Sequence, residues 1–452
     1  MVLSDQATLP TKDRAAAGKR LRRVVPREAH GEWRAGPERV DPLTLLEEQN
    51  LARIPQLVPV RMGRMAVSPF AFYRGAAAVM AADLASTPVM GIEVVSCGDA
   101  HLSNFGLFAS PERRLLFDVN DFDETLPAPW EWDIKRLAAS GMIAARQNGF
   151  ARAQSEEVVR GAVRSYRERI ITFARLAALD TYYSRVDTKS IVKVMATVPR
   201  NQIDKVVAAA RRNTAARAMS KLTVSGDGPP RIVDQPPLVV HPPDIQSDRP
   251  LIDAAVAAYM ASLREDVALL LSRFRPVDVA HKVVGVGSVG TACFVILLLD
   301  DQDAPLFLQV KEAQQSVLER HWRPSAIEHP GRRVVSGQRI MQSASDIFLG
   351  SSSAQGHHFY VRQLRDMKWS APIETFAPPA LTEYLELCGW VLARAHAQSG
   401  PAAEIAGYLG SSSAFEEAIV RFAAAYADQN EIDYQVLLAA IKAGRISAQF
   451  GA

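Results

Sequence analysis

Cysteine is scarce in this chain, and its scarcity excludes a disulfide scaffold. The sequence has 452 residues but only three cysteines, Cys97, Cys293 and Cys388, which lie far apart. None belongs to a Cys-x-x-Cys pair, and no Cys/His cluster has the spacing of a zinc site. A reducing compartment is the simplest interpretation of this composition, and we expect a cytoplasmic protein.

Long apolar runs and net charge are also lacking. The first thirty residues contain no apolar segment of the kind found in signal peptides. The most apolar run, residues 292–299, is far shorter than the roughly 20 residues that a membrane helix needs. Fifty-two Lys and Arg against 49 Asp and Glu leave a net charge of +3. We therefore expect neither a membrane nor a nucleic acid as a partner.

The first motif that carries chemistry runs from Cys97 to Gly106, directly after a short strand predicted at residues 92–95. It places Asp99, His101 and Asn104 within six residues. Phosphoryl-transfer enzymes of the kinase type use an Asp and an Asn at this spacing in their catalytic loop. Asp99 would accept the proton of the substrate hydroxyl, and Asn104 would hold a magnesium ion.

A second motif follows, where the apolar strand predicted at 115–119 ends in a cluster of carboxylates. Asp121 lies 17 residues after Asn104, close to the distance at which kinase-like enzymes place a metal-binding Asp. Asp118, Asp121 and Asp123 are all candidate metal ligands, and the sequence leaves open which of them binds. The alternative is a solvated acidic turn.

The third motif is glycine-rich and comprises Gly285, Gly287, Ser288 and Gly290. A dinucleotide site would need a helix after these glycines, whereas residues 291–299 have the composition of a strand. The pattern therefore favours a hairpin folded over nucleotide phosphates. A second strand at 306–310 then leads to Lys311, which has the position of the kinase lysine that contacts phosphates.

Four further residues or segments are predicted to support these motifs. A helix after Lys311 should supply a Glu partner for the lysine, and among Glu312, Glu319 and Glu328 we favour Glu319. Asp133, at the start of a helix, resembles the Asp with which aminoglycoside-phosphotransferase-like enzymes brace their catalytic loop through backbone N–H groups, and the alternative is a plain helix-start carboxylate. Residues 360–366 are a candidate hinge that touches adenine, and His396 is interpreted as a packed helix residue. Helices are also predicted at 70–84 and 251–274.

The order of these motifs is the reverse of the order in ordinary kinases, because Asp99 and Asp121 precede Gly285 and Lys311. The sequence therefore predicts a circular permutation. The chain closely resembles a bacterial family designated domain of unknown function 2252, over nearly its whole length. The segments that carry this resemblance are Ser68–Gly75, Gly98–His101, Asn120–Glu124, Gly285–Gly290 and Ala393–Ala397.

The resemblance implies an α+β, two-lobed protein-kinase-like fold, similar to aminoglycoside phosphotransferases but circularly permuted. It implies no established substrate. Two departures from kinases matter: Cys97 replaces the usual His, and no Ala-Pro-Glu segment follows the acidic strand. The second departure argues against a peptide substrate.

We divide the chain into five parts. Residues 1–60 form a basic arm and a helix, and residues 61–225 form a helical lobe with the catalytic loop and the metal-binding strand. Residues 226–250 are a proline-rich linker, residues 251–370 form a β-rich lobe with a leading helix, and residues 371–452 are helices that complete the helical lobe.

The expected function is an ATP- and Mg²⁺-dependent phosphotransferase acting on the hydroxyl of an unidentified small molecule. Asn104 and Asp121 would bind the metal, and the glycine loop with Lys311 would hold the nucleotide phosphates. Two alternatives remain: nucleotidyl (AMP) transfer with the nucleotide in a flipped pose, and a non-catalytic nucleotide-binding scaffold. The sequence does not indicate the oligomeric state.

Overall fold

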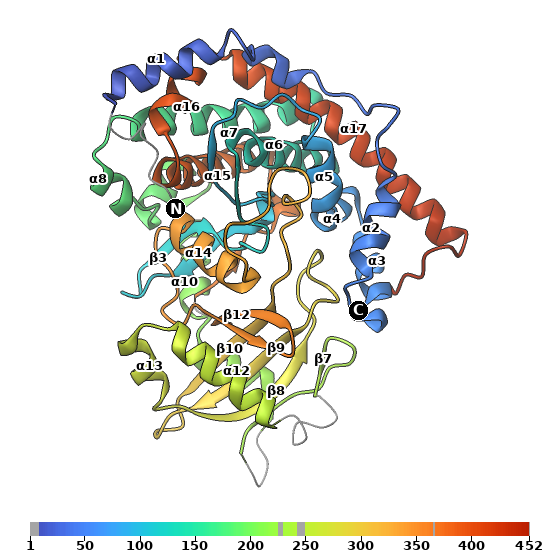
Figure 1. The fold of residues 1–452 in the computed structure, drawn as a ribbon, viewed down its shortest axis with the longest axis vertical. Helices are drawn as coiled ribbons and strands as arrows, with labels where there is room; N and C mark the ends of the chain where they lie inside the picture. The colour runs from blue at the N-terminus through green and yellow to red at the C-terminus, as the bar shows by residue number, and fades with distance from the viewer. Residues whose placement is uncertain (1–8, 225–228, 242–248, 365–366, 452) are drawn as a thin grey trace.

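The structure is a computed structural model, and it describes residues 9–224, 229–241, 249–364 and 367–451. It is a mixed α+β fold. Most helices gather in one region and the largest sheet lies in another, as Figure 1 shows. The helices that precede the sheet along the chain are α1 (Thr11–Leu21), α2 (Pro42–Asn50), α3 (Val58–Met65), α4 (Pro69–Gly75), α5 (Ala77–Leu84), α6 (Trp130–Gln147), α7 (Arg152–Phe173), α8 (Ala178–Tyr183), α9 (Thr188–Val194), α10 (Arg200–Arg211) and α11 (Ala215–Leu222).

The later helices are of two kinds, those beside the sheet and those that return to the helical region. The first kind comprises α12 (Arg249–Ser262), α13 (Glu265–Leu271) and α14 (Pro330–Met341). The second comprises α15 (Pro378–Ser399), α16 (Ala402–Leu409) and α17 (Ala414–Lys442). Short 3₁₀ turns are η2 (Arg27–Gly31), η3 (Pro55–Leu57), η4 (Leu102–Asn104) and η5 (Ile373–Thr375).

The core of the helical region joins segments from both ends of the chain. Helix α15 packs along α7, and α17 crosses α6 and α7. Val158 and Val163 on α7 and Leu385 on α15 are almost completely buried in this core. Burying such side chains contributes about 1.5–3 kcal/mol each. The core of the helical region is therefore built from residues that precede the main sheet along the chain and from residues that follow it.

Two predicted helices are interrupted in the structure. The predicted helix 70–84 begins as expected, since Ser68 Oγ accepts a hydrogen bond from the N–H of Ala71 at 3.1 Å and Pro69 occupies the first turn. It is then divided at Ala76, whose φ of −108° and ψ of 36° are not helical. The predicted helix 251–274 is likewise two helices, α12 and α13. Local composition predicted these helices but not the breaks between them.

The main sheet has six strands in the order β11-β12-β10-β9-β8-β7, with every neighbouring pair antiparallel. The strands are β7 (Val239–Val240), β8 (Arg275–Lys282), β9 (Cys293–Leu299), β10 (Pro305–Glu312), β11 (Gly350–Ala354) and β12 (His357–Gln363). Side chains of β9 alternate between the two faces, as strand geometry requires. Val295 and Leu297 enter one apolar cluster, whereas Leu298 enters the other, beside Tyr259 of α12.

Small strand pairs connect the sheet to the helices. They are β1 (Glu93–Ser96) with β4 (Leu126–Pro129), β2 (Phe105–Ala109) with β3 (Leu115–Val119) and β13 (Trp369–Ser370), and β5 (Thr223–Val224) with β6 (Arg231–Ile232). The strands predicted at 92–95 and 115–119 correspond to β1 and β3. The loop after β1 and the segment after β3 contain the predicted catalytic residues.

The predicted linker 226–250 is partly structured. Val239 and Val240 form β7, which pairs with β8 at the edge of the main sheet. Residues 226–228 and 242–248 of this predicted linker lie outside the described residues.

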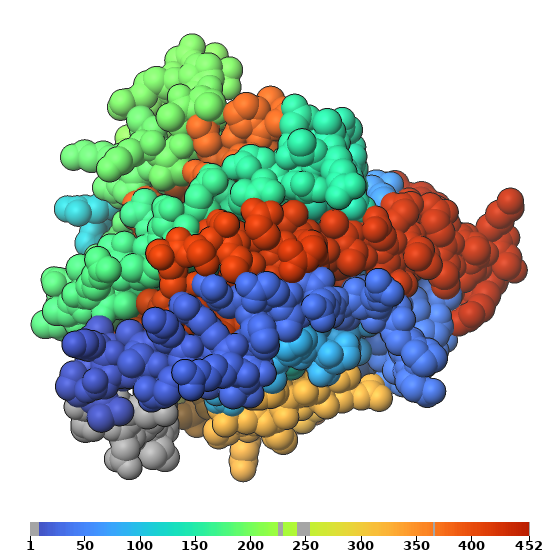
Figure 2. Space-filling model, turned by 90° about the horizontal axis from the view of Figure 1, so that it is seen from above, coloured from blue at the N-terminus to red at the C-terminus, as the bar shows by residue number. Residues whose placement is uncertain are grey.

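The basic N-terminal arm packs against the C-terminal helices along the part that the structure describes. Arg22 donates to the backbone oxygens of Tyr408 at 2.7 Å and Gly407 at 2.6 Å, and Arg27 donates to the oxygen of Leu409 at 2.7 Å. Figure 2 shows the N-terminal segment lying beside α17. Within the described ranges, no helix is both long and apolar enough to cross a membrane.

Candidate functional site

The loop that follows β1 has a conformation that glycine permits and other residues would not. Gly98 has a φ of +77°, and a Cβ there would lie 2.3 Å from the backbone oxygen of Glu124. Asp133, on the first turn of α6, accepts hydrogen bonds from the N–H groups of Cys97 at 2.7 Å and Gly98 at 2.9 Å. The predicted brace is therefore present in the structure.

Asp133 is itself held by a buried histidine. His396 Nε2 lies 3.2 Å from Asp133 Oδ2, and its Nδ1 lies 2.9 Å from the hydroxyl of Tyr166. His396 is completely buried on α15, so the structure confirms it as a packed helix residue. This chain of contacts links the loop to α6, α7 and α15.

Asp99 is paired with an arginine that the sequence did not single out. Arg136 Nε lies 2.8 Å from Asp99 Oδ1, and Arg136 Nη2 lies 2.7 Å from the same oxygen. Burial favours the neutral acid, but Arg136, His101 and Arg74 outweigh it and lower the pKa of Asp99. Burial lowers the pKa of His101 to about 3, so this ring is neutral near pH 7. Asp99 is therefore an ionised acceptor of low basicity.

Asp118 is not placed to bind a metal, which corrects its assignment as a candidate ligand. Its side chain is 1% exposed and points away from the loop. Asp118 Oδ2 accepts a hydrogen bond from the N–H of Ser343 at 2.8 Å and lies 3.5 Å from Arg394. Asp118 belongs to the fully buried strand β3, whereas Asp121 and Asp123 follow the end of that strand.

Lys311 lies beside the acidic segment despite its distance in the chain. Its Nζ bonds to Asp123 Oδ2 and lies 3.9 Å from Asp121 Oδ1. Asp123 Oδ1 also accepts a hydrogen bond from the hydroxyl of Tyr360 at 2.7 Å. Burial opposes ionisation of Asp123, but Lys311 outweighs it and lowers the pKa of this carboxyl. Asp123 is thus engaged by the lysine.

Asp121 has the properties expected of a metal ligand. Its Oδ1 is buried and has no hydrogen-bond partner among the residues that the structure describes. Burial and the nearby Asp123 raise the pKa of Asp121, which a cation would reverse. Asn104 Nδ2 donates to the backbone oxygen of Asp99 at 2.8 Å, which leaves its side-chain oxygen for another partner.

No group of three or more His, Cys, Asp or Glu side chains in the described ranges is arranged to hold a metal by itself. Mg²⁺ commonly takes one or two protein ligands and completes its shell with phosphate and water oxygens. Asp121 and Asn104 fit that requirement.

Glu319 is not the partner of Lys311, so this prediction is wrong. No helix follows the lysine directly, since α14 begins only at Pro330. Glu319 lies in the intervening loop, where it accepts hydrogen bonds from the N–H groups of Ser316 and Ser325 and lies 3.8 Å from Arg333. The lysine pairs with Asp123, which sequence spacing could not indicate.

The glycine-rich segment forms the connection of an antiparallel hairpin between β8 and β9, as predicted. The hairpin is held from outside by residues near α3. Arg64 donates to the oxygen of Gly285 at 2.6 Å, and Ile54 N–H donates to the oxygen of Gly290 at 2.8 Å. A Cβ at Gly287 would lie 3.2 Å from the backbone oxygen of Arg74, so the loop approaches α4 closely.

A cavity of about 320 Å³ lies beneath this hairpin. Among the predicted site residues, seven line it: Asp99, Asn104, Asp121, Asp123, Gly285, Gly287 and Ser288. Lys311 lies behind Asp123, while Asp118, Gly290 and Glu319 are not part of the lining. Three arginines that the sequence analysis did not assign, Arg53, Arg61 and Arg74, also line it. Arg74 belongs to the segment 68–75, but a single arginine there gave no signal of its role.

The predicted hinge contributes nothing to this lining among the residues that the structure describes. Arg362 of β12 instead reaches across to Gln309 Oε1 at 3.0 Å and to the backbone oxygen of Asn120 at 3.0 Å. Residues 365 and 366 of the predicted hinge lie outside the described residues.

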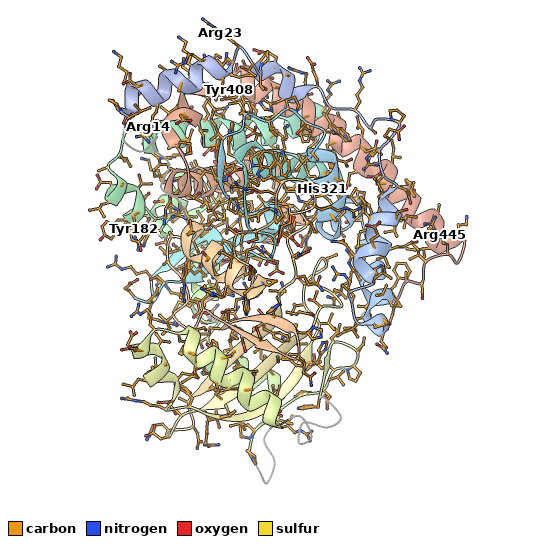
Figure 3. The ribbon with its side chains drawn as sticks, viewed as in Figure 1. Arg14, Arg23, Tyr182, His321, Tyr408 and Arg445 are labelled. Atoms are coloured by element: carbon orange, nitrogen blue, oxygen red, sulfur yellow. The ribbon has the colours of Figure 1, made fainter. Side chains whose placement is uncertain are left out.

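A second cavity, of about 430 Å³, lies at the edge of the helical region. Arg14 of α1 and Tyr182 of α8 both line it, and Figure 3 shows them on the same side of the molecule. Arg14 is the one charged side chain in its described lining. This cavity therefore lacks the carboxylates and the glycine loop that mark the first.

Comparison with known proteins gives one match. A family profile described as "Uncharacterized protein conserved in bacteria (DUF2252)" matches residues 53–440. This range includes the Asp99 loop, the acidic segment, the glycine hairpin and Lys311. No curated protein and no solved structure matches the chain.

Proposed function

The chain belongs to the DUF2252 family, and we propose that it is an ATP- and Mg²⁺-dependent phosphotransferase that acts on a hydroxyl group of a small molecule. One observation carries the proposal. Lys311, 188 residues from Asp123, bonds to it beside a cavity that is lined by Asp99, Asn104, Asp121 and the glycine hairpin. These are the residue types and relative positions that phosphoryl transfer requires.

The same proposal includes the fold, a two-lobed protein-kinase-like fold that is circularly permuted. Three features support it. The glycine-rich connection joins the first two long strands of the sheet, the lysine lies on the next strand, and a helix, α14, separates that strand from β11 and β12. Kinases arrange a glycine loop and the lysine of their third strand in this way. In this chain the catalytic loop precedes these elements.

Each residue has a chemical task in this proposal. Asn104 and Asp121 would hold Mg²⁺, which when bound neutralises charge that develops on phosphate oxygens. Backbone N–H groups of residues 285–290 and Lys311 would hold the nucleotide phosphates, after the lysine exchanges part of its contact with Asp123. Asp99 would orient the acceptor hydroxyl and take its proton as the new P–O bond forms and the bond to the departing ADP breaks.

The volume of the cavity supports a small-molecule acceptor. At about 320 Å³ it lies at the lower end of the range for small-ligand sites, which is roughly 300–1,000 Å³. The hairpin is also closed from outside by Ile54 and Arg64. A folded protein substrate would have to reach Asp99 past these contacts.

The decisive measurement is MgATP binding by calorimetry. We expect wild type to bind MgATP and Lys311→Met to bind at least tenfold more weakly, because a charge-assisted contact to phosphate is lost. Lys205→Met is the control, because this lysine lies on α10, an element with no residue in the cavity lining and none in the glycine hairpin. If wild type binds no MgATP, or if Lys311→Met binds it equally well, the proposed function fails.

Nucleotidyl transfer remains a second candidate for one specific reason. Arg362 extends toward Gln309 and Asn120, and β12 does not line the cavity, so a nucleoside has no visible contact with the predicted hinge. A flipped nucleotide would avoid that contact. Mass spectrometry of acceptor products separates the candidates, since phosphate and AMP add different masses.

A further inference from the structure

Three arginines form one wall of the cavity, and none of them belongs to the machinery described above. Arg53 precedes η3, Arg61 lies on α3 and Arg74 lies on α4, so all come from the segment that precedes the Asp99 loop. Arg61 is completely buried, and the other two are partly buried. Buried guanidinium groups are costly unless an anion or good hydrogen-bond acceptors compensate them.

The other cations of the site are neutralised by carboxylates. Arg136 is paired with Asp99, and Lys311 is paired with Asp123. The arginines of the wall differ, because their partners are neutral. Arg53 donates to the backbone oxygen of Val289 at 2.5 Å.

Arg61 has neutral partners only. It donates to the side-chain oxygens of Asn50 at 2.7 Å and Gln49 at 3.1 Å and to the backbone oxygen of Gly75 at 2.9 Å. Its Nε is buried and has no hydrogen-bond partner within the described part of the chain.

Arg74 is the least satisfied of the three. Its Nε is buried without a hydrogen-bond partner, and no ion pair joins it to a carboxylate among the described residues. It is attracted from a distance by Asp99 and Asp121. Burial lowers the pKa of Arg74, and it lowers the pKa of Arg53 to about 10. In both arginines burial outweighs the attraction of nearby carboxylates, which are Asp99, Glu374 and Asp121 for Arg74 and Glu124, Asp123 and Glu312 for Arg53.

We propose that Arg53, Arg61 and Arg74 bind a phosphate group of the acceptor, so that the acceptor is a small hydroxyl compound that already carries a phosphate. This inference rests on the proposed function. Three guanidinium groups suit a doubly charged phosphate, whereas a carboxylate is satisfied by one bidentate arginine. Arg74 lies on the side of Asp99, where the acceptor hydroxyl must be, and the glycine hairpin with Lys311 is available for the nucleotide.

The proposal predicts that a mutation in the arginine wall weakens binding of the acceptor and leaves binding of the nucleotide unchanged. The probes are glycerol 3-phosphate and glycerol, titrated by calorimetry into protein that is saturated with Mg²⁺ and the non-hydrolysable ATP analogue AMP-PNP. We expect binding of glycerol 3-phosphate and at least tenfold weaker binding of glycerol. Arg74→Gln should weaken glycerol 3-phosphate at least tenfold and change the affinity for MgAMP-PNP by less than twofold.

Two variants guard against misfolding. Arg74→Lys keeps the charge and should retain part of the affinity. Arg339→Gln changes an exposed arginine of α14 outside the cavity lining and should alter the binding of neither ligand. The thermal midpoint of each variant is measured alongside. If Arg74→Gln is unfolded, Arg74→Lys supplies the comparison, because Arg53 bonds to the hairpin that the nucleotide would use.

The outcomes distinguish this inference from the proposed function. If MgAMP-PNP binds but glycerol 3-phosphate binds no better than glycerol, the arginine wall is not a phosphate site and the phosphotransferase proposal stands. If Arg74→Gln weakens MgAMP-PNP as much as glycerol 3-phosphate, the wall serves the nucleotide and the inference is overturned. If MgAMP-PNP does not bind, the proposed function fails, and Arg74-dependent binding of glycerol 3-phosphate to the protein alone would support the anion site by itself.

Discussion

Two aspartates of one short segment, Asp118 and Asp121, have opposite surroundings. Asp118 is buried among hydrogen-bond donors, which include the N–H groups of Val119 and Ser343. Asp121 faces the cavity, and its buried Oδ1 has no hydrogen-bond partner in the described chain. A carboxylate that is satisfied by the protein stabilises the fold, whereas one that is not satisfied is available to a ligand.

Substitution of each aspartate by asparagine separates these roles. Asp118→Asn should lower the free energy of unfolding by about 2 kcal/mol, since its amide group would face donors, and folded protein should still bind MgATP. Asp121→Asn should leave stability unchanged or raise it, because the charge that is removed lies close to Asp123, and should abolish Mg²⁺-dependent ATP binding. Urea unfolding and calorimetry measure the two effects, and loss of MgATP binding in folded Asp118→Asn would contradict the assignment.

A second residue-scale feature is the fully buried pair Glu131 and Lys135 on α6. Glu131 accepts a hydrogen bond from the N–H of Met90 at 2.7 Å, while Lys135 Nζ has no hydrogen-bond partner in the described residues. Burial raises the pKa of Glu131 to about 7 and lowers that of Lys135 to about 7. The contribution of Glu131 to stability is present below its unfolded pKa of 4.5 and is lost as the pH rises through 7. That of Lys135 is present above 10.5 and is lost as the pH falls through 7.

The double variant Glu131→Gln with Lys135→Met should therefore be more stable than wild type near pH 7, by about 1–2 kcal/mol. The glutamine keeps the acceptor for Met90, and the methionine keeps the packing against Phe422. The difference should shrink toward pH 5 and toward pH 9. Urea unfolding at the three pH values measures it, and a constant difference would show that the pair does not titrate as described.

At the scale of elements, the glycine hairpin is a supported structure. Leu57 and Val60 form an apolar cluster with Val283, which precedes the glycines, and Val289, which lies between Gly287 and Gly290. Backbone and arginine contacts from the same N-terminal segment add to this cluster. Movement of the hairpin is thus coupled to α3.

Val60→Ala should loosen the hairpin specifically. The loss of buried contacts costs about 1–2 kcal/mol and should raise hydrogen exchange of peptides that span residues 283–290 by roughly fivefold or more. Val163→Ala, in the core of the helical region, is the matched control and should leave that exchange unchanged. Equal acceleration in both variants would indicate general destabilisation instead.

Elements with a strong local signal were predictable from the sequence. The glycine-rich hairpin, the strand that carries Lys311 and the capped start of α4 follow from patterns within a few residues. The brace by Asp133, 36 positions from Cys97, was instead expected from the resemblance to aminoglycoside phosphotransferases. The break at Ala76 and the late start of α14 were not predicted, since a single glycine such as Gly75 is tolerated within a helix and the loop before α14 is fixed by the distant contacts of Arg333. Arg333 donates to the backbone oxygens of Gln314, Asp123 and Thr125.

At the scale of the whole molecule, Arg39 joins three distant segments. It lies 2.7 Å from Asp83 Oδ1 on α5 and 2.6 Å from Asp433 Oδ2 on α17. Arg39 and Asp433 lie 394 positions apart in the chain, and Lys311 and Asp123 lie 188 positions apart. Such contacts depend on tertiary packing, which is why the partner of Lys311 and the arginine wall could not be read from one sequence.

Arg39→Met should lower the free energy of unfolding by about 3 kcal/mol at pH 8, because two buried carboxylates lose their cation. The loss should be smaller at pH 5, since burial raises the pKa of Asp83 and removal of the arginine raises it further, so that this carboxyl can take up a proton. Arg146→Met removes an exposed pair with Asp428 and should cost about 0.5 kcal/mol or less. Urea unfolding of both variants measures these differences, and similar losses would contradict the role of Arg39.

The packing of α15 against α7 also has a consequence for synthesis on the ribosome. Roughly two hundred residues separate the end of α7 from the start of α15, and translation at about 5–20 residues per second takes on the order of 10–40 s to cover them. During that interval α7 has emerged without α15, the helix that covers it, and Asp133 lacks its contact with His396. The nascent chain therefore carries an exposed apolar helix surface for almost half of its synthesis, which is the kind of surface that chaperones bind.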